Sequence, residues 1–411
     1  MLGSKGNSIE GLMFNVAFVI FCIATFLDAL HKSAFPFLPM ALISNYLRIL
    51  ASLIAYTLYL KKERVTISLL IPVFFAILLP LYFRSAYTSQ IFASLSLILV
   101  ARYVKFDVIV DWIIKYLSIA LIAATVLSVL GIIPNETVYK EVPIVGAWKS
   151  YYMGFHYFST PAYYGMTLVI LLLYKKRLNC SYRYLLFLTG LSFLVFVVAF
   201  ARLQFLINLL TIIAYIVVYK WKLFSFRGKI WKYIAMLAFP VMTLVIVFLS
   251  FSLILLSDSS FFEFINEWTS TRMVLNIQAF LTYDINLFGN LIEVKTRDLV
   301  PGESYFFIDS GYVYYLLSYG LVFYVFLMVM YGRIFYNVWK CNCKFLYIIL
   351  LIFSVANMFN NFMVSVITCP VVLLMFADFE KQDSLYEGRP YKLRKLKQYL
   401  IVKSKVKMSL T

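Results

Sequence analysis

The sequence predicts an all-α polytopic membrane protein with about twelve transmembrane helices and a large outer loop that carries short helices. Of the 411 residues, 63% are hydrophobic and only 14% are charged, so polar side chains are too few to cover the surface of a soluble globule. Apolar runs of about 17–25 residues, the length that a helix needs to cross a bilayer, recur from near the N-terminus almost to the end. We therefore expect an integral membrane protein.

Each expected span is an apolar run bounded by polar or charged residues. In chain order the expected spans are Gly11–Leu30, Met40–Leu60, Thr66–Phe83, Thr88–Val104, Ile113–Ile133, Pro161–Tyr174, Tyr184–Phe200, Leu203–Tyr219, Tyr233–Leu256, Val313–Tyr331, Phe345–Phe359 and Met363–Phe376.

Four regions follow from this pattern. Residues 1–256 hold transmembrane helices 1–9, with an outer loop at about 134–160, and residues 257–310 form the large outer loop. Residues 311–376 hold transmembrane helices 10–12, and residues 377–411 form a basic cytoplasmic tail.

The distribution of lysine and arginine sets the orientation, because cytoplasmic loops retain positive charge. Placing both termini in the cytoplasm puts most of the 37 basic residues inside, including Lys61–Arg64, Lys175–Arg177 and Arg333–Lys344. The net charge of +18 then reflects topology and a tail near anionic membrane lipid, and it requires no nucleic-acid partner.

The sequence offers no signal for a cofactor or a metal. It contains no glycine-rich phosphate loop and no His/Asp/Glu cluster at metal-ligand spacing. The five cysteines lie in expected spans or on the cytoplasmic side, which argues against disulfides in the outer loops.

Three arginines are candidates for binding an anion at or near the outer face, where the positive-inside bias does not explain them. Arg202 occupies the outer turn between two expected spans, and Arg272 lies on an expected helix of the large loop. Their guanidinium groups match phosphate oxygens, although Arg202 could snorkel to lipid phosphate and Arg272 could pair with Glu267 or Asp284. Arg48 lies within a span, where pairing with Asp28 and contact with a ligand are equally open.

His156 and Asp309 are the candidate catalytic residues. His156 lies in the Gly154-Phe155-His156-Tyr157 stretch, where it could act as a base, bind a sugar hydroxyl or be structural. Asp309 immediately precedes an expected span, so we expect it to cap that helix, which lowers the pKa of its carboxyl and weakens it as a base. A fixed carboxylate there could still orient a hydroxyl group.

Tyrosines in the outer segments are candidate stacking surfaces for sugar rings, although most of the 32 tyrosines are expected to serve packing and interfacial belts. The residues selected for this role are Tyr152, Tyr157 and Tyr312.

The large outer loop has predicted structure of its own. Apolar residues recur at helical spacing across Arg272–Leu281, with Ser270 as the candidate cap. Phe288-Gly289-Asn290 and Pro301-Gly302 are typical of turns.

These features resemble the bacterial O-antigen and capsular polysaccharide polymerases of the Wzy type, a group related to the O-antigen ligases. The resemblance covers the many spans, the medium outer loop and the large late outer loop. Short motifs add to it: Gly154-Phe155-His156 with Gly165, the outward Arg202, Arg272 at the start of a loop helix, and a partial match at Phe288-Gly289-Asn290. The lead into the tenth span resembles the family pattern through Asp309, Tyr312 and Gly320, and the ligases' His-Asn pair is replaced here by Asp309-Ser310.

The resemblance implies a GT-C-like membrane glycosyltransferase in the bacterial plasma (inner) membrane. Its substrate would be an oligosaccharide on undecaprenyl diphosphate, and the growing glycan would move to the non-reducing end of another lipid-linked repeat unit. Arg202, Arg272 and Arg48 would gather in one outer pocket to bind the diphosphate, while His156 or Asp309 positions the acceptor hydroxyl. No cofactor is implied, and a chain-length regulator protein is a candidate partner.

Two alternatives remain open. A ligase would move finished glycan to a different acceptor, and a flippase or other transporter would catalyse no transfer. Transporters are commonly built from paired repeats with broken helices, and the sequence shows no matched pair of interrupted spans, which favours an enzyme.

Overall fold

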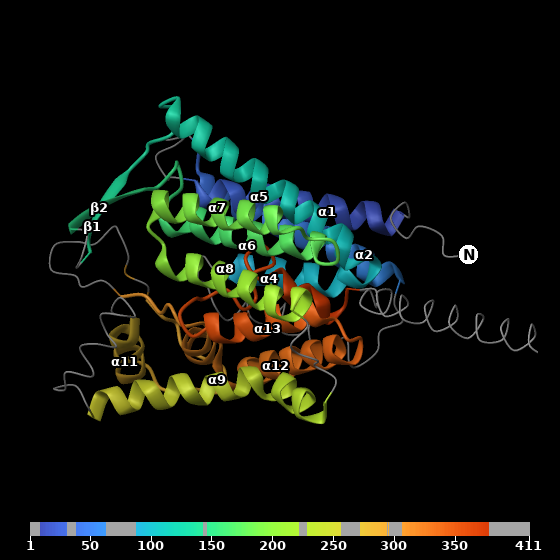
Figure 1. Cartoon of the computed structure of the whole chain (residues 1–411). Helices are drawn as coiled ribbons and strands as arrows, with labels where there is room; N and C mark the ends of the chain where they lie inside the picture. Colours follow the sequence, from blue (N-terminus) through green and yellow to red (C-terminus); the bar gives the residue numbers. More distant parts are fainter. Residues whose placement is uncertain are drawn as a thin grey trace, which may run out of the picture.

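The computed structural model is a bundle of roughly parallel and antiparallel helices with a small cap at one end (Figure 1). It describes residues 9–30, 38–62, 88–142, 146–221, 228–255, 272–293, 295 and 306–377. Several sequence predictions lie outside these residues, namely the span Thr66–Phe83, the cap Ser270, the turn Pro301-Gly302 and the tail beyond residue 377.

The helices of the first half are listed here in chain order: α1 (Ile9–Ala29), α2 (Met40–Lys62), α4 (Thr88–Val100), the short η1 (Ala101–Tyr103), α5 (Phe106–Val129), α6 (Ser159–Lys176) and α7 (Tyr182–Ala199). Those of the second half are α8 (Arg202–Tyr215), the π-helical η2 (Ile216–Lys220), α9 (Lys229–Leu255), α11 (Arg272–Thr282), α12 (Gly311–Lys340), α13 (Lys344–Ala356) and the short η3 (Pro370–Met375).

Within the described residues, seven helices are long and apolar enough to cross a membrane. They are α1, α2, α5, α7, α8 together with η2, α9 and α12. Long apolar runs form helices because a helix satisfies its own backbone hydrogen bonds, which is essential where water is absent. The predicted helical architecture, with several helices able to cross a membrane, is thus confirmed, whereas the twelve spans, the orientation and the GT-C-like arrangement remain predictions.

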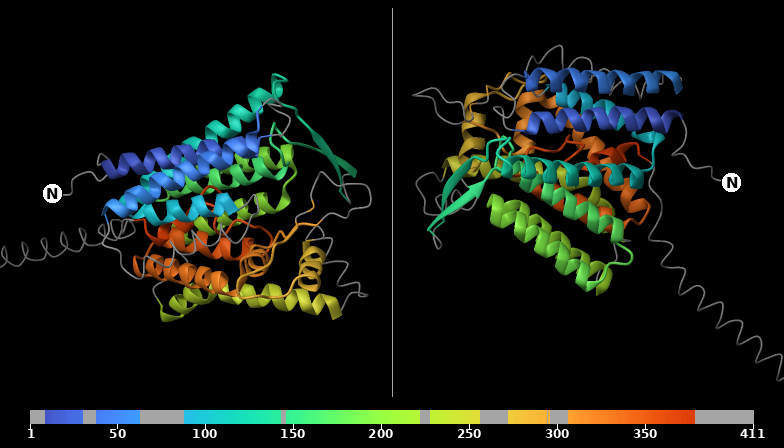
Figure 2. Two further views of the ribbon diagram at one scale, coloured as in Figure 1. Left: turned by 180° about the vertical axis from the view of Figure 1, so that it is seen from behind. Right: turned by 90° about the horizontal axis from the view of Figure 1, so that it is seen from above.

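The predicted loop at about 134–160 contains a β-hairpin, which was not predicted from the sequence. Strands β1 (Thr137–Val142) and β2 (Gly146–Tyr151) pair in antiparallel register, with Thr137 opposite Tyr151. Figure 2 shows the hairpin and α11 at the same end of the bundle, opposite the N-terminus. Because the expected topology puts the N-terminus inside, we refer to this end as the outer end.

Gly320 breaks α12 into two arms. Its backbone has φ 80° and ψ 170°, which is not helical. The Tyr312 and Tyr331 rings lie 6.2 and 4.0 Å from the Phe239 ring centroid, whereas the intervening residues of a continuous helix would separate them by about 28 Å. The chain therefore bends sharply at Gly320, and both arms pack against α9.

A loop after α11 fills the break in α12. The amide groups of Leu321 and Val322 donate to the carbonyls of Asn286 and Leu287 at 2.9 and 3.1 Å, and the Asn290 amide donates to the Leu317 carbonyl at 2.8 Å. These contacts satisfy backbone groups that the break would otherwise leave unpaired. The predicted turn at residues 288–290 is confirmed, and its contacts hold α11 and α12 together.

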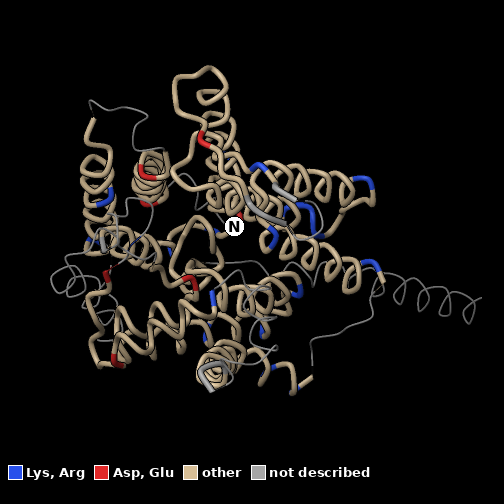
Figure 3. The backbone as a smooth tube through the Cα atoms, turned by 90° about the vertical axis from the view of Figure 1, so that its left-hand side faces the viewer, with Lys and Arg blue, Asp and Glu red and all other residues tan. Residues whose placement is uncertain are grey.

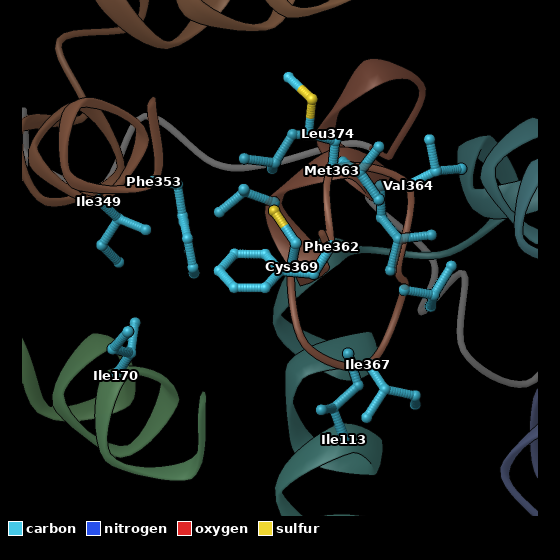
Figure 4. Packing of buried hydrophobic residues seen from close by; sticks show 14 of the residues in the cluster. Ile113, Ile170, Ile349, Phe353, Phe362, Met363, Val364, Ile367, Cys369 and Leu374 are labelled. Atoms are coloured by element: carbon cyan, nitrogen blue, oxygen red, sulfur yellow. The ribbon is translucent and has the colours of Figure 1, made fainter. Parts of the chain in front are cut away.

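The expected span Met363–Phe376 is not a transmembrane helix in the structure. Turns occupy the segment until the six-residue η3, and its side chains are almost entirely buried in the middle of the bundle. Figure 4 shows Met363, Ile367 and Cys369 from this segment packed near α5, α6 and α13. Pro370 disfavours helix at the residue before it, and the run is shorter than the roughly 20 residues that a span needs.

Candidate functional site

Arg272 and Asp309 form an ion pair at the outer end of the bundle. Arg272 is the first residue of α11, and its Nε lies 3.4 Å from Oδ2 of Asp309, which stands two residues before α12 begins. Its Nη1 also donates to the Phe359 carbonyl at 2.7 Å. The Arg272 guanidinium therefore connects α11, the residues before α12 and the residues after α13. In the view onto this end of the bundle, most of the helical backbone is uncharged (Figure 3).

The segment after α13 completes this group. The Gly311 amide lies 2.9 Å from the Asn357 carbonyl and 3.0 Å from the Asn360 carbonyl. The Tyr163 hydroxyl of α6 donates to Oδ1 of Asn360 at 2.8 Å. We call Arg272, Asp309 and residues 357–361 the outer polar cluster.

The structure corrects the predicted role of Asp309. Ser310, not Asp309, caps α12, because its hydroxyl accepts a hydrogen bond from the Val313 amide at 3.4 Å. Burial raises the pKa of the Asp309 carboxyl above its ordinary value, and the nearby Arg272 guanidinium opposes that rise. The direction is opposite to the one expected for a capping carboxylate, and it makes Asp309 a stronger base than a solvated aspartate.

Replacing Arg272 with glutamine is expected to raise the pKa of Asp309 further. The substitution removes the positive charge that opposes the effect of burial, so protonated Asp309 should persist to higher pH. An infrared titration of the carboxylic C=O band, with Asp309→Asn as the blank, measures this change. A midpoint that is unchanged or lower in Arg272→Gln would show that Arg272 does not set the charge state of Asp309.

Arg48 lies on α2 and pairs with a residue of α1, not with the outer polar cluster. It is 2% exposed on α2, and its Nη2 lies 2.8 Å from Oδ2 of Asp28 on α1. Its Nη1 donates at 3.5 Å to Oδ1 of Asn45, on the same helix, and at 3.5 Å to Oγ of Ser89, on α4. The pairing with Asp28 that the sequence left open is therefore present.

Arg202 is the first residue of α8, in the short turn that follows α7, and it is exposed. Its guanidinium lies 5.9 Å from the centroid of the Phe200 ring, which stacks on Trp148 of the hairpin. The three arginines thus contact different residues. The expectation that they gather in one pocket finds no support among the described contacts.

His156 lies between the hairpin and α6. Its amide donates to the Ala29 carbonyl at the end of α1, and its ring centroid is 4.4 Å from that of Tyr157. The side chain is 9% exposed. The first turns of α6 link this region to the outer polar cluster through Tyr163.

Two of the candidate sugar-stacking tyrosines are core residues. Tyr312 is 1% exposed and donates from its hydroxyl to the Ser354 carbonyl at 2.6 Å, which leaves no ring face for a sugar. Tyr152 is buried and packs edge-on against Phe158. Tyr157, beside His156, is only partly buried and remains a candidate.

Tyr163 and the asparagines of the outer polar cluster were not among the site residues predicted from the sequence. A signal was available, because Asn357, Asn360 and Asn361 are amides within an otherwise apolar stretch. Buried amides need hydrogen-bond partners, so their presence in such a stretch points to a polar interior.

The comparisons with known proteins add no assignment to this site. No protein-family model, curated protein or solved structure matches the chain.

Proposed function

We propose that the chain is a polysaccharide polymerase of the outer face of the bacterial plasma membrane. It would transfer a growing glycan from undecaprenyl diphosphate to the non-reducing end of another lipid-linked repeat unit. The observation that supports this proposal is the Arg272–Asp309 pair at 3.4 Å, because a guanidinium group, which suits phosphate oxygens, lies beside a carboxylate of raised pKa.

The proposed reaction uses both members of the pair. The acceptor hydroxyl oxygen bonds to the anomeric carbon while the bond from that carbon to the diphosphate oxygen breaks. Asp309 accepts the hydroxyl proton and later releases it to water, and Arg272 stabilises the negative charge that develops on the departing undecaprenyl diphosphate. Because the diphosphate is both activator and leaving group, this scheme requires no cofactor.

The other candidates have secondary roles in this proposal. Exposed Arg202 is a candidate first contact for diphosphate at the membrane surface, and buried Arg48 is a candidate contact deeper in the bundle. His156 is a candidate for orienting the acceptor sugar together with Tyr157.

A transporter is the second candidate, and the broken α12 is the observation that favours it. Broken transmembrane helices commonly expose backbone groups to a transported ion or substrate. Here the loop at 286–290 already occupies the amide and carbonyl groups around Gly320. The break therefore offers few free backbone groups, and the enzyme remains the better-supported proposal.

The size of glycan on cells that lack the chain tests the proposed function. Loss of long glycan, with single units still displayed outside, is the result expected for a polymerase. Accumulation of intermediates on the inner face would instead indicate a flippase, and full-length lipid-linked glycan that never reaches its final acceptor would indicate a ligase.

A further inference from the structure

Three asparagines on the segments that contribute the Arg272–Asp309 pair and its contacts have an unused hydrogen-bond acceptor. The Oδ1 atoms of Asn276, Asn357 and Asn361 are buried and have no hydrogen-bond partner. Asn276 is 1% exposed and Asn357 is fully buried. A buried carbonyl oxygen without a donor costs free energy, so three of them on these adjoining segments require an explanation.

The amide orientation of Asn357 follows from its contacts. Its Nδ2 donates to the Phe353 carbonyl at 2.8 Å at the end of α13. Flipping the amide would bring Oδ1 against that carbonyl, where two acceptors repel. The Oδ1 atom of Asn357 therefore stays unpaired within the protein.

All three residues adjoin contacts of the outer polar cluster. Asn276 lies one helical turn after Arg272 and so on the same face of α11. Asn357 and Asn361 flank Phe359, whose carbonyl accepts from Arg272. A Cβ atom built on Gly311, two residues after Asp309, would lie 3.3 Å from Oδ1 of Asn357.

The chemistry of these oxygens selects the ligand. Amide oxygens only accept hydrogen bonds, so phosphate oxygens would be repelled and hydroxyl groups would be bound. The described residues contain no group of three or more His, Cys, Asp or Glu side chains that could hold a metal ion. Asn360, in the same segment, already accepts from a hydroxyl group, that of Tyr163, at 2.8 Å.

We propose that Asn276, Asn357 and Asn361 form a subsite for the hydroxyl groups of a sugar, beside the Arg272–Asp309 pair. This inference rests on the proposed function and deepens it, because it assigns the two parts of the lipid-linked substrate to different groups. The sugar hydroxyls bind the asparagine oxygens, and the diphosphate faces Arg272.

Binding to the full-length chain in lipid nanodiscs tests the subsite. The two probes are undecaprenyl diphosphate without sugar and the lipid-linked single units extracted from cells that lack the chain. Asn276→Leu and Asn361→Leu are each expected to weaken binding of the sugar-bearing lipid about tenfold, the effect of losing roughly one hydrogen bond. Binding of the sugar-free lipid should stay unchanged.

Asn208→Leu is the matched control. Asn208 is also buried with an unpaired Oδ1, but it lies on α8 and donates to Ser192 of α7. It should not affect binding of the sugar-bearing lipid. Leucine replaces an amide whose acceptor is unpaired, so the variants should fold, and thermal unfolding checks this. If a leucine variant fails to fold, the alanine variant at the same position replaces it.

The outcomes separate the two proposals. Unchanged binding in both asparagine variants, equal losses for both probes, or the same loss in Asn208→Leu would overturn the subsite. Wild-type protein that binds both probes with equal affinity would also overturn it while leaving the lipid-binding part of the proposed function in place. Wild-type protein that binds neither probe would refute both proposals.

Discussion

Replacing Gly289 with alanine is expected to cause the largest loss of stability of any substitution considered for this chain. Gly289 has φ +90°, and an added Cβ would lie 2.3 Å from the Ser318 carbonyl oxygen and 2.7 Å from the Gly320 amide nitrogen. Both are backbone atoms, so no side-chain rotation relieves the clash. Conformational strain and overpacking each cost about 1–3 kcal/mol, so we expect a total of several kcal/mol.

The same substitution should disturb the candidate site. The loop at 286–290 continues from α11 and is hydrogen-bonded to both arms of α12. Because α11 carries Arg272 and α12 begins next to Asp309, displacing this loop should change the relative position of the ion pair. Glycan polymerisation should fall together with stability.

Thermal unfolding of purified protein in detergent measures the stability effect. Gly190→Ala is the matched control, since a Cβ there meets no atom within 4 Å and Gly190 lies within helix α7. It should leave stability unchanged or raise it slightly, because alanine favours helix over glycine. An unfolding temperature of Gly289→Ala equal to that of the wild type would show that the loop is not docked as described.

Replacing Arg272 with alanine is expected to have the largest effect on activity, reducing polymer formation on the order of 10²–10³-fold. The substitution removes the cation proposed to stabilise the leaving diphosphate and leaves the Asp309 carboxylate without its ionic partner. Arg272→Lys should retain part of the activity, because lysine keeps the charge but lacks the planar, multiply donating guanidinium. Glycan length on cells and transfer rates with lipid-linked units give the readout.

Two further arginine variants accompany this experiment, one as a control and one as a test of Arg202. Arg183→Ala removes an exposed arginine near the start of α7, at the opposite end of that helix from Arg202, and should leave polymer length unchanged. Arg202→Ala should abolish long glycan if Arg202 also binds diphosphate, and unchanged length would remove Arg202 from the mechanism. Full activity of Arg272→Ala, at equal protein levels in the membrane, would contradict the proposed function.

Much of the helical architecture could be predicted from hydrophobicity. Runs such as Gly11–Leu30 and Met40–Leu60 closely match α1 and α2, since a long apolar run in a membrane must satisfy its backbone groups internally. The outer helix predicted for Arg272–Leu281 matches α11 for a similar reason, because the spacing of its apolar residues is set by helical geometry. These predictions depend on local sequence only.

The candidate site could be predicted only in part. The sequence singled out Arg272 and Asp309 separately but offered Glu267 or Asp284 as partners for Arg272, because nearby residues are the natural first choice. The observed partner is Asp309, which becomes a neighbour only when α11 packs beside the start of α12. The same folding buries Asp309, which reverses the expected direction of its pKa shift.

The sequence by itself determined a helical chain with several helices long and apolar enough to cross a membrane, because hydrophobic length and residue spacing are local properties. Only the tertiary structure decided that α12 breaks at Gly320 and that residues 357–377 fill the core without a transmembrane helix. A glycine alone does not end a helix. The break persists because a loop distant in sequence supplies the backbone partners that the interrupted helix lacks.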